Sequence, residues 1–260
     1  MIGDSSLRIV KLGGRAQSSP ELPGAIAAAW HAAPGALCVV HGGGDAVSTL
    51  QRRLGHEPAF VGGRRITTSQ DIDVLRMSLS GATNKQLVAA LMSVGLPAVG
   101  LSGEDAGLIA ARPLDEATLG RVGAPTCIHG SLIRHLLAGG YLPVISPLAR
   151  DASALHAAAA LNVNGDDAAA AIARALGARE LLFVSDVAGV IVRDAVVETL
   201  DVGDAVAAIA DGTAAGGMAA KLQAAIAALA SGVERVRIGD VHALGDTERG
   251  TVLFQSRSLV

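Results

Sequence analysis

Short apolar runs alternate with helix-patterned segments along nearly the whole chain, and this alternation restricts the possible folds more than any other feature. Seven runs have the length and residue types of strands, at 7–14, 36–44, 98–103, 141–147, 180–186, 233–240 and 250–254. Between them, apolar residues recur with a period near 3.6, as after Gly217, where one helix face would carry Met218, Leu222, Ala225 and Leu229. The alternation predicts an α/β fold, a mainly parallel sheet with helices on both faces, which is a three-layer αβα sandwich.

Composition narrows the class of protein further. Aromatic residues make up only 2 % of the chain, so the core must be packed from small aliphatic side chains. Mean hydropathy is +0.45, but no apolar run reaches the roughly 20 residues that span a bilayer. The net charge of −3 argues against a nucleic-acid partner. Cys38 and Cys127 are far apart and are expected to be reduced, buried thiols of a cytoplasmic protein with no membrane partner.

Two local patterns predict helix positions. Thr68 and Asp71 have the spacing of a capping box, with aspartate in place of the usual glutamate, before the helical pattern IDVLRMSLSG. The alanine-rich stretch 153–176 is compositionally biased, but its pattern is helical and we do not expect it to be disordered.

Three glycine clusters fall where apolar runs end or helix patterns begin, at Gly13–Gly14, Gly42–Gly44 and Gly216–Gly217. A backbone without Cβ atoms allows a ligand to approach closely, and the free N–H groups of a first helical turn attract anions. Any one such turn could be purely structural, but three at one sheet edge predict a phosphate site. None fits the GxxxxGK[ST] pattern or the dinucleotide pattern GxGxxG, so the site has a different design.

Two lysines adjoin these glycines. Lys11 interrupts the apolar run LRIVKLGG, where a charge is costly unless it is paired. Lys221 lies one helical turn inside GGMAAK, where a cation opposes the helix dipole unless a bound polyphosphate reverses the sign. Both are candidate phosphate ligands; the alternative for Lys221 is a solvated helix residue.

The acidic segment NVNGDD, residues 162–167, precedes another helical pattern. Asn164 can cap that helix, and Asp166 and Asp167 suit its first turn, so capping alone would explain these three residues. It does not explain Asn162. A carboxylate here could instead orient the two lysines or assist through magnesium-bound water.

The segment GGRRIT, residues 62–67, places Arg64 and Arg65 after a glycine turn. The planar guanidinium of arginine suits a carboxylate, and the alternative is ordinary surface charge. Adjacent strand residues point to opposite faces, so at most one of the two is expected to face the site.

Eight motifs follow one another along the chain: KLGG (11–14), HGGG (41–44), GRRIT (63–67), GATNK (81–85), GLSGEDAG (100–107), NVNGDDAA (162–169), FVSDVAGV (183–190) and GGMAAK (216–221). Together they resemble the amino acid kinase family, and within it the kinases that phosphorylate N-acetyl-L-glutamate. The resemblance implies two lobes, with residues 1–176 binding the acyl amino acid and forming the dimer, and residues 177–260 binding the nucleotide. It implies transfer of the ATP γ-phosphoryl group to the side-chain carboxylate of N-acetyl-L-glutamate, the second step of arginine biosynthesis.

The resemblance also implies a role for individual residues. Lys11 and Lys221 match the lysines that neutralise the transferring phosphoryl group and the leaving phosphate, and Asp166 matches the aspartate that holds both lysines. No protein metal site is expected, because Mg²⁺ is held mainly by the ATP phosphates.

For the substrate, Arg65 matches the arginine that binds the α-carboxylate, and Asn162 matches its companion. Gly43 and Gly44 match backbone donors around the substrate and the γ-phosphate. The residues expected near the nucleotide are Gly13, Gly14, Ser185, Asp186 and Gly217. The sequence departs from the family pattern at Gly165, where alanine is usual, and in the short segment 191–200, which lacks an Asp-Gly turn.

The resemblance also bears on assembly. Arginine-inhibited members of the family carry an extra N-terminal helix that links dimers into a hexameric ring. Only MIGDSS precedes Leu7 here, under two helical turns and with poor helix formers. We therefore expect a homodimer joined through helices around 68–94, without feedback inhibition by arginine.

Two alternatives remain for the activity. One is a kinase of the same family for another N-acylated amino acid, of the aminoadipate or succinylglutamate type, because sequence rarely resolves one methylene. The other is a non-catalytic amino-acid sensor on the same fold. A sensor would be expected to lack a lysine or the aspartate, whereas Lys11, Asp166 and Lys221 are all present.

Overall fold

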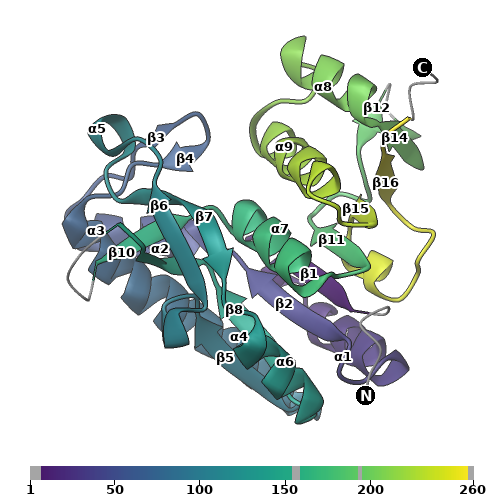
Figure 1. Cartoon of the computed structure of the whole chain (residues 1–260), viewed down its shortest axis with the longest axis horizontal. Helices are drawn as coiled ribbons and strands as arrows, with labels where there is room; N and C mark the ends of the chain where they lie inside the picture. Colours follow the sequence, from purple (N-terminus) through teal and green to yellow (C-terminus); the bar gives the residue numbers. More distant parts are fainter. Residues whose placement is uncertain (1–6, 154–158, 193–194, 257–260) are drawn as a thin grey trace.

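The computed structural model describes residues 7–153, 159–192 and 195–256 (Figure 1). Its centre is an eight-stranded sheet in which only the pair β15–β16 is antiparallel. The strands, in order across the sheet, are β14 (Thr199–Asp201), β16 (Thr251–Phe254), β15 (Arg235–Gly239), β11 (Glu180–Val184), β1 (Arg8–Leu12), β2 (Leu37–His41), β8 (Leu142–Ser146) and β5 (Ala98–Ser102). All seven expected strands are confirmed. The segment 1–6, on which the expectation about arginine rests, lies outside the described residues.

Helices cover both faces of this sheet (Figure 1). The helices α1 (Leu22–Ala32) and α4 (Asn84–Ser93) carry the chain towards the β5 edge, whereas α6 (Ser131–Ala138) and α7 (Gly165–Leu176) carry it back. Crossovers between parallel strands are right-handed, so helices that carry the chain in opposite directions across the sheet lie on its opposite faces. The helix α9 (Gly216–Ala230) packs beside α7. The αβα sandwich predicted from the sequence is therefore confirmed.

Four further strands close into a small barrel that the sequence did not indicate: β6 (Ile109–Pro113), β7 (Val122–Ile128), β9 (Leu148–Asp151) and β10 (Ala160–Val163). The prediction of helix throughout 153–176 is wrong over β10, because pairing with β7 and β9 overrides the helix propensity of alanine. Among the described residues of this stretch the helix begins at Gly165, and residues 154–158 lie outside the described residues. Cys127, on β7, is exposed rather than buried, whereas Cys38 is buried as expected.

The segment between β2 and β5 contributes many of the residues that line the main cavity. It contains α2 (Gly44–Arg53), the hairpin of β3 (Phe60–Val61) and β4 (Arg64–Arg65), and α3 (Ser69–Leu75), which continues through a π-helical segment, η3 (Arg76–Thr83), into α4. The hairpin turns at Gly62 and Gly63, whose φ angles of +56° and +76° favour glycine. The expected capping box of Thr68 and Asp71 is confirmed.

The remaining elements lie in connections. They are η2 (Ala16–Ser18), η4 (Asp105–Gly107), α5 (Glu116–Leu119), β12 (Ile191–Val192), β13 (Ala195–Val196), α8 (Val202–Ala210) and η5 (Val241–Leu244). Within the ranges that the structure describes, no helix has both the length and the apolar character needed to cross a membrane.

Candidate active site

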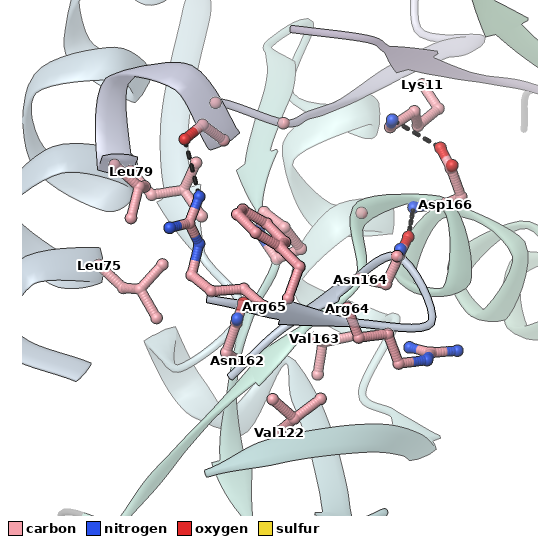
Figure 2. Close-up of a pocket in the computed structure, with 18 residues that line it drawn as sticks. Lys11, Arg64, Arg65, Leu75, Leu79, Val122, Asn162, Val163, Asn164 and Asp166 are labelled. Atoms are coloured by element: carbon pink, nitrogen blue, oxygen red, sulfur yellow. Dashed lines mark hydrogen bonds and ion pairs between the residues drawn. The ribbon is translucent and has the colours of Figure 1, made fainter. Parts of the chain in front are cut away.

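Lys11 and Asp166 form a buried ion pair between β1 and the start of α7. Lys11 Nζ lies 2.6 Å from Asp166 Oδ1, and the two residues are 8 % and 6 % exposed. Lys11 is on β1, and Asp166 is in the first turn of α7, whose start is fixed by Asn164: its Oδ1 accepts the Asp166 N–H at 2.7 Å. The sequence expectation that a lysine inside an apolar strand must be paired is therefore confirmed (Figure 2).

Lys221 belongs to the same electrostatic group. The pKa of Lys221 is lowered, mainly because the side chain is buried. The carboxylate of Asp166 opposes this shift, as does that of Asp186, whereas the charge of Lys11 adds to it. Its Nζ lies 3.5 Å from the carbonyl oxygen of Gly217, one turn earlier in α9. Lys11 is paired with Asp166, whereas Lys221 has no carboxylate within ion-pair distance among the described residues, and this arrangement of positive charge suits an anion.

The glycines after β2 are held by a buried histidine. His41 Nδ1 donates to Gly42 O at 2.7 Å, and Asn84 Nδ2 donates to His41 Nε2 at 3.0 Å, which fixes one neutral tautomer. Burial lowers the pKa of His41 to about 4. The Gly42 carbonyl faces His41, so the Gly43 N–H of the same peptide faces away, and it has no acceptor among the described residues. It is available to a ligand.

Only glycine fits at position 43. A Cβ there would lie 2.8 Å from Leu79 Cδ1 on η3, and the φ angle is +155°. The next residue, Gly44, begins α2, so the free N–H groups of its first turn open beside Gly43.

Arg65 is buried, at 7 % exposure, but no carboxylate lies within ion-pair distance of it among the described residues. Its Nη2 donates to Gly44 O and Ser48 Oγ, both at 2.8 Å, and its Nη1 donates to Gln51 Oε1. Its guanidinium carbon lies 4.7 Å from the ring centroid of Phe60. Burial lowers the pKa of Arg65, which Asp71 partly offsets. All direct contacts are neutral, so the charge of Arg65 remains available to a ligand carboxylate.

One cavity joins these groups. Lys11, Gly43, Gly44, Arg65, Asn162 and Asp166 all line it, together with apolar residues from α2, the hairpin and η3 (Figure 2). Asn162 is held by its Nδ2, which donates to Thr67 Oγ1 at 2.9 Å. The structure therefore places every expected substrate residue and two of the three expected catalytic residues around a single space.

The residues expected near the nucleotide lie outside that cavity. Ser185 and Asp186 line a separate hollow with Arg15, whose Nη1 lies 3.0 Å from Asp186 Oδ2 and lowers the pKa of that carboxyl. Gly14 borders another hollow. The Gly13 N–H donates to Val184 O at 2.9 Å, so this backbone group is already occupied within the protein.

Sequence reasoning missed two residues that hold Arg65. Gln51 and Ser48 support Arg65 from one face of α2, and their spacing of three residues on a helix was the signal that could have identified them. Arg64 points away from Arg65, as strand alternation predicts, and its Nη1 lies 2.8 Å from Asp167 Oδ2. The expectation that at most one of the two arginines would face the site is wrong, because both line the cavity.

Comparison with known proteins gives consistent results. The sequence profile of the amino acid kinase family matches residues 6–240. The chain is 39 % identical to the acetylglutamate kinase of Chloroflexus aurantiacus over 244 residues, 93 % of this chain and 95 % of that protein.

Solved structures are similar over almost the whole chain. The crystal structure of smu.665 from Streptococcus mutans UA159 has a TM-score of 0.84 at 28 % identity, covering 96 % of this chain and 98 % of that one. Carbamate kinase from Giardia lamblia bound to citric acid has a TM-score of 0.73 at 17 % identity, covering 98 % and 100 %, which is a likeness of fold alone.

Proposed function

The chain belongs to the amino acid kinase family, and we propose that it phosphorylates the side-chain carboxylate of N-acetyl-L-glutamate with ATP, giving N-acetylglutamyl 5-phosphate and ADP. This reaction is the second step of arginine biosynthesis. One observation carries the proposal: the cavity that holds Arg65 without a carboxylate partner also holds the Lys11–Asp166 pair. A substrate with one carboxylate to be gripped and another to be phosphorylated fits such a cavity.

The chemistry requires no general base from the protein. The attacking carboxylate has an ordinary pKa of about 4.3 and is ionised at neutral pH. Its oxygen forms a bond to the γ-phosphorus, and the bond from that phosphorus to the β–γ bridging oxygen breaks, with the electron pair leaving on ADP. Lys11 and Lys221 neutralise the charge on the transferring group and the leaving phosphate, and Asp166 orients them.

The acyl amino acid is positioned by groups on the opposite side of the cavity. Arg65 binds the α-carboxylate, and Asn162 lies beside it as a second polar contact. The N–H groups of Gly43 and Gly44 serve as donors to the substrate and the transferred phosphoryl group. Gln51 and Ser48 keep the guanidinium in place when no ligand is bound.

We place the nucleotide on the other side of Lys11, against residues 177–260, with residues 1–176 forming the substrate lobe. Its proposed contacts are Gly13, Gly14, Ser185, Asp186 and Gly217. In the described residues, no group of three or more histidine, cysteine or acidic side chains is arranged to bind a metal. In this proposal the ATP phosphates supply most ligands of the accompanying Mg²⁺.

We also propose a homodimer joined through the helices around 68–94. The large side chains of Met77 and Met92, on η3 and α4, are 54 % and 60 % exposed and offer apolar surface for such a contact. Both cysteines are free thiols, which fits the cytoplasm that we propose as the location.

A coupled assay of ADP release tests the function. Purified protein would be supplied with ATP, Mg²⁺ and either N-acetyl-L-glutamate, N-succinyl-L-glutamate or N-acetyl-L-aminoadipate. We expect the highest kcat/KM with N-acetyl-L-glutamate. Higher efficiency with either rival would transfer the assignment to that substrate, and binding of an amino acid without turnover of any substrate would favour a sensor.

A further inference from the structure

The β3–β4 hairpin forms one wall of the cavity and is attached to the protein on two sides. Phe60, Gly63, Arg64 and Arg65 all line the cavity. Arg65 bonds to α2, whereas Arg64 reaches α7, where its Nη1 lies 2.8 Å from Asp167 Oδ2. Figure 2 shows the two arginines leaving the same strand in opposite directions. Each strand of the hairpin has only two residues, so these side chains do much of the anchoring.

The start of α7 carries two successive carboxylates, and each is paired with a different cation. Asp166 pairs with Lys11 from the central sheet, and Asp167 pairs with Arg64 from the hairpin. The Arg64 and Asp167 side chains are 31 % and 28 % exposed, so the second pair is partly shielded from solvent. The same helical turn therefore holds both the phosphoryl-binding lysine and the wall of the substrate cavity.

We propose that Arg64 and Asp167 are positioning residues that seat the hairpin against α7, so that Arg65 meets the substrate α-carboxylate at the correct place; this inference rests on the proposed function. We assign Arg64 to the hairpin and not to the substrate, because its Nη1 is held 2.8 Å from Asp167 Oδ2 on α7 and its side chain leaves the strand away from Arg65. Arg65, whose contacts are all neutral, remains the group that binds the carboxylate. The pair acts on the substrate only through the hairpin.

Seating of the hairpin and simple charge repulsion by Asp167 have opposite effects on the KM for the substrate when Asp167 is removed. N-acetyl-L-glutamate is a dianion at neutral pH. If Asp167 acted only through its negative charge near the cavity, Asp167→Ala would attract the substrate and lower its KM. If Asp167 seats the hairpin, the same substitution raises KM, as Arg64→Ala does.

The test is a double-mutant cycle on the full-length protein with Arg64→Ala, Asp167→Ala and the double variant. A partly exposed ion pair supports a rise of about two- to five-fold in KM for N-acetyl-L-glutamate in each single variant. We expect the KM for ATP and kcat to stay near the wild-type values. The KM of the double variant for N-acetyl-L-glutamate should be no higher than that of the more impaired single variant. Arg64→Lys should restore most of the loss. Arg52 lies on α2 in an exposed pair with Glu57, and Arg52→Ala is the control for loss of a nearby cation.

A lowered KM in Asp167→Ala, or additive effects of the two substitutions, would overturn the proposal. So would an effect of Arg64→Ala confined to N-succinyl-L-glutamate, which would make Arg64 a ligand of the acyl group. Hydrogen exchange without ligand gives a readout independent of activity: amides of residues 59–66 should exchange faster in both single variants. Absence of turnover by the wild type would refute the proposed function, whereas unchanged exchange would refute the role of this pair.

Discussion

Asp166 lies 2.6 Å from Lys11 inside the protein, and its charge also acts on Lys221. We expect Asp166→Asn to lower kcat about 10²-fold, the scale of losing one preorganised electrostatic group, because both lysines lose their orienting charge. Steady-state ADP release measures the effect. Asp167→Asn is the matched control, since it also removes a carboxylate from the first turn of α7 and should leave kcat nearly unchanged. If the two variants lost thermal stability alike and kept kcat, Asp166 would be only a helix-capping residue.

Lys11→Ala and Lys221→Ala are each expected to lower kcat by about 10²–10³, because each removes one cation from the path of the transferring phosphoryl group. The KM for N-acetyl-L-glutamate should change much less, since neither lysine is proposed to bind its α-carboxylate. Rapid-quench measurement of the chemical step would separate this loss from slow product release. Either variant, folded by circular dichroism and turning over near the wild-type rate, would disprove the assignment of that lysine.

Arg65→Ala should raise the KM for N-acetyl-L-glutamate far more than the KM for ATP. A buried, charge-assisted contact of arginine with a carboxylate is worth about 1.5–3 kcal/mol, or about 10- to 150-fold in binding. Arg65→Lys should recover only part of the loss, because lysine lacks the planar fork. Initial rates over a grid of both substrates give the two KM values. Equal rises in the two KM values would contradict a specific contact with the substrate carboxylate. A larger rise in the KM for N-acetyl-L-glutamate in Arg64→Ala would assign that contact to Arg64 instead of Arg65.

We expect the protein to lose stability in mild acid because His41 is buried in its neutral form. Burial lowers the pKa of His41 from 6.5 to about 4 in the folded protein, so the unfolded chain binds the extra proton between those values. The contribution of neutral His41 to the free energy of unfolding is complete above pH 6.5. It falls by up to about 1.4 kcal/mol per pH unit as the pH drops towards 4. Urea unfolding at pH 7.5 and 5.5 measures it. In His41→Gln, which does not titrate, the decrease should be smaller by about 1 kcal/mol; an identical decrease in both proteins would exclude His41 as its source.

Arg237 is expected to be a major contributor to stability. It is 0 % exposed; its Nε donates to Glu180 Oε1 at 2.9 Å, and its Nη atoms donate to three carbonyl oxygens of the following loop, those of Ala243, Asp246 and Arg249. Arg237→Met should lower the free energy of unfolding by about 3 kcal/mol or more, because a buried carboxylate loses one partner and three carbonyls lose theirs.

Arg235→Met is the comparison for this effect. Arg235 lies on the same strand, but its Nε is 3.6 Å from Glu180 and its side chain is 34 % exposed, so a loss below about 1 kcal/mol is expected. Equal losses in the two variants, measured by urea unfolding, would show that burial of Arg237 is not the cause.

The sequence by itself determined the central architecture. The seven apolar runs became strands of the main sheet because a parallel sheet buried on both faces needs continuous aliphatic segments, and the amphipathic period between them formed the covering helices. The glycine clusters and Lys11 could also be identified, since a charge inside such a strand requires a partner. These are local signals, because each depends on residues near one another in the chain.

Only the tertiary structure decided which groups meet. No local pattern connects Lys11 with Asp166 or Arg64 with Asp167; the order of strands and the crossing of α7 bring them together. The alanine-rich residues of β10 became a strand because β7 and β9 offered backbone partners, which outweighs the small helix preference of alanine. Propensity and periodicity act over a few residues, whereas ion pairing and sheet closure depend on distances in space that the folded chain alone sets.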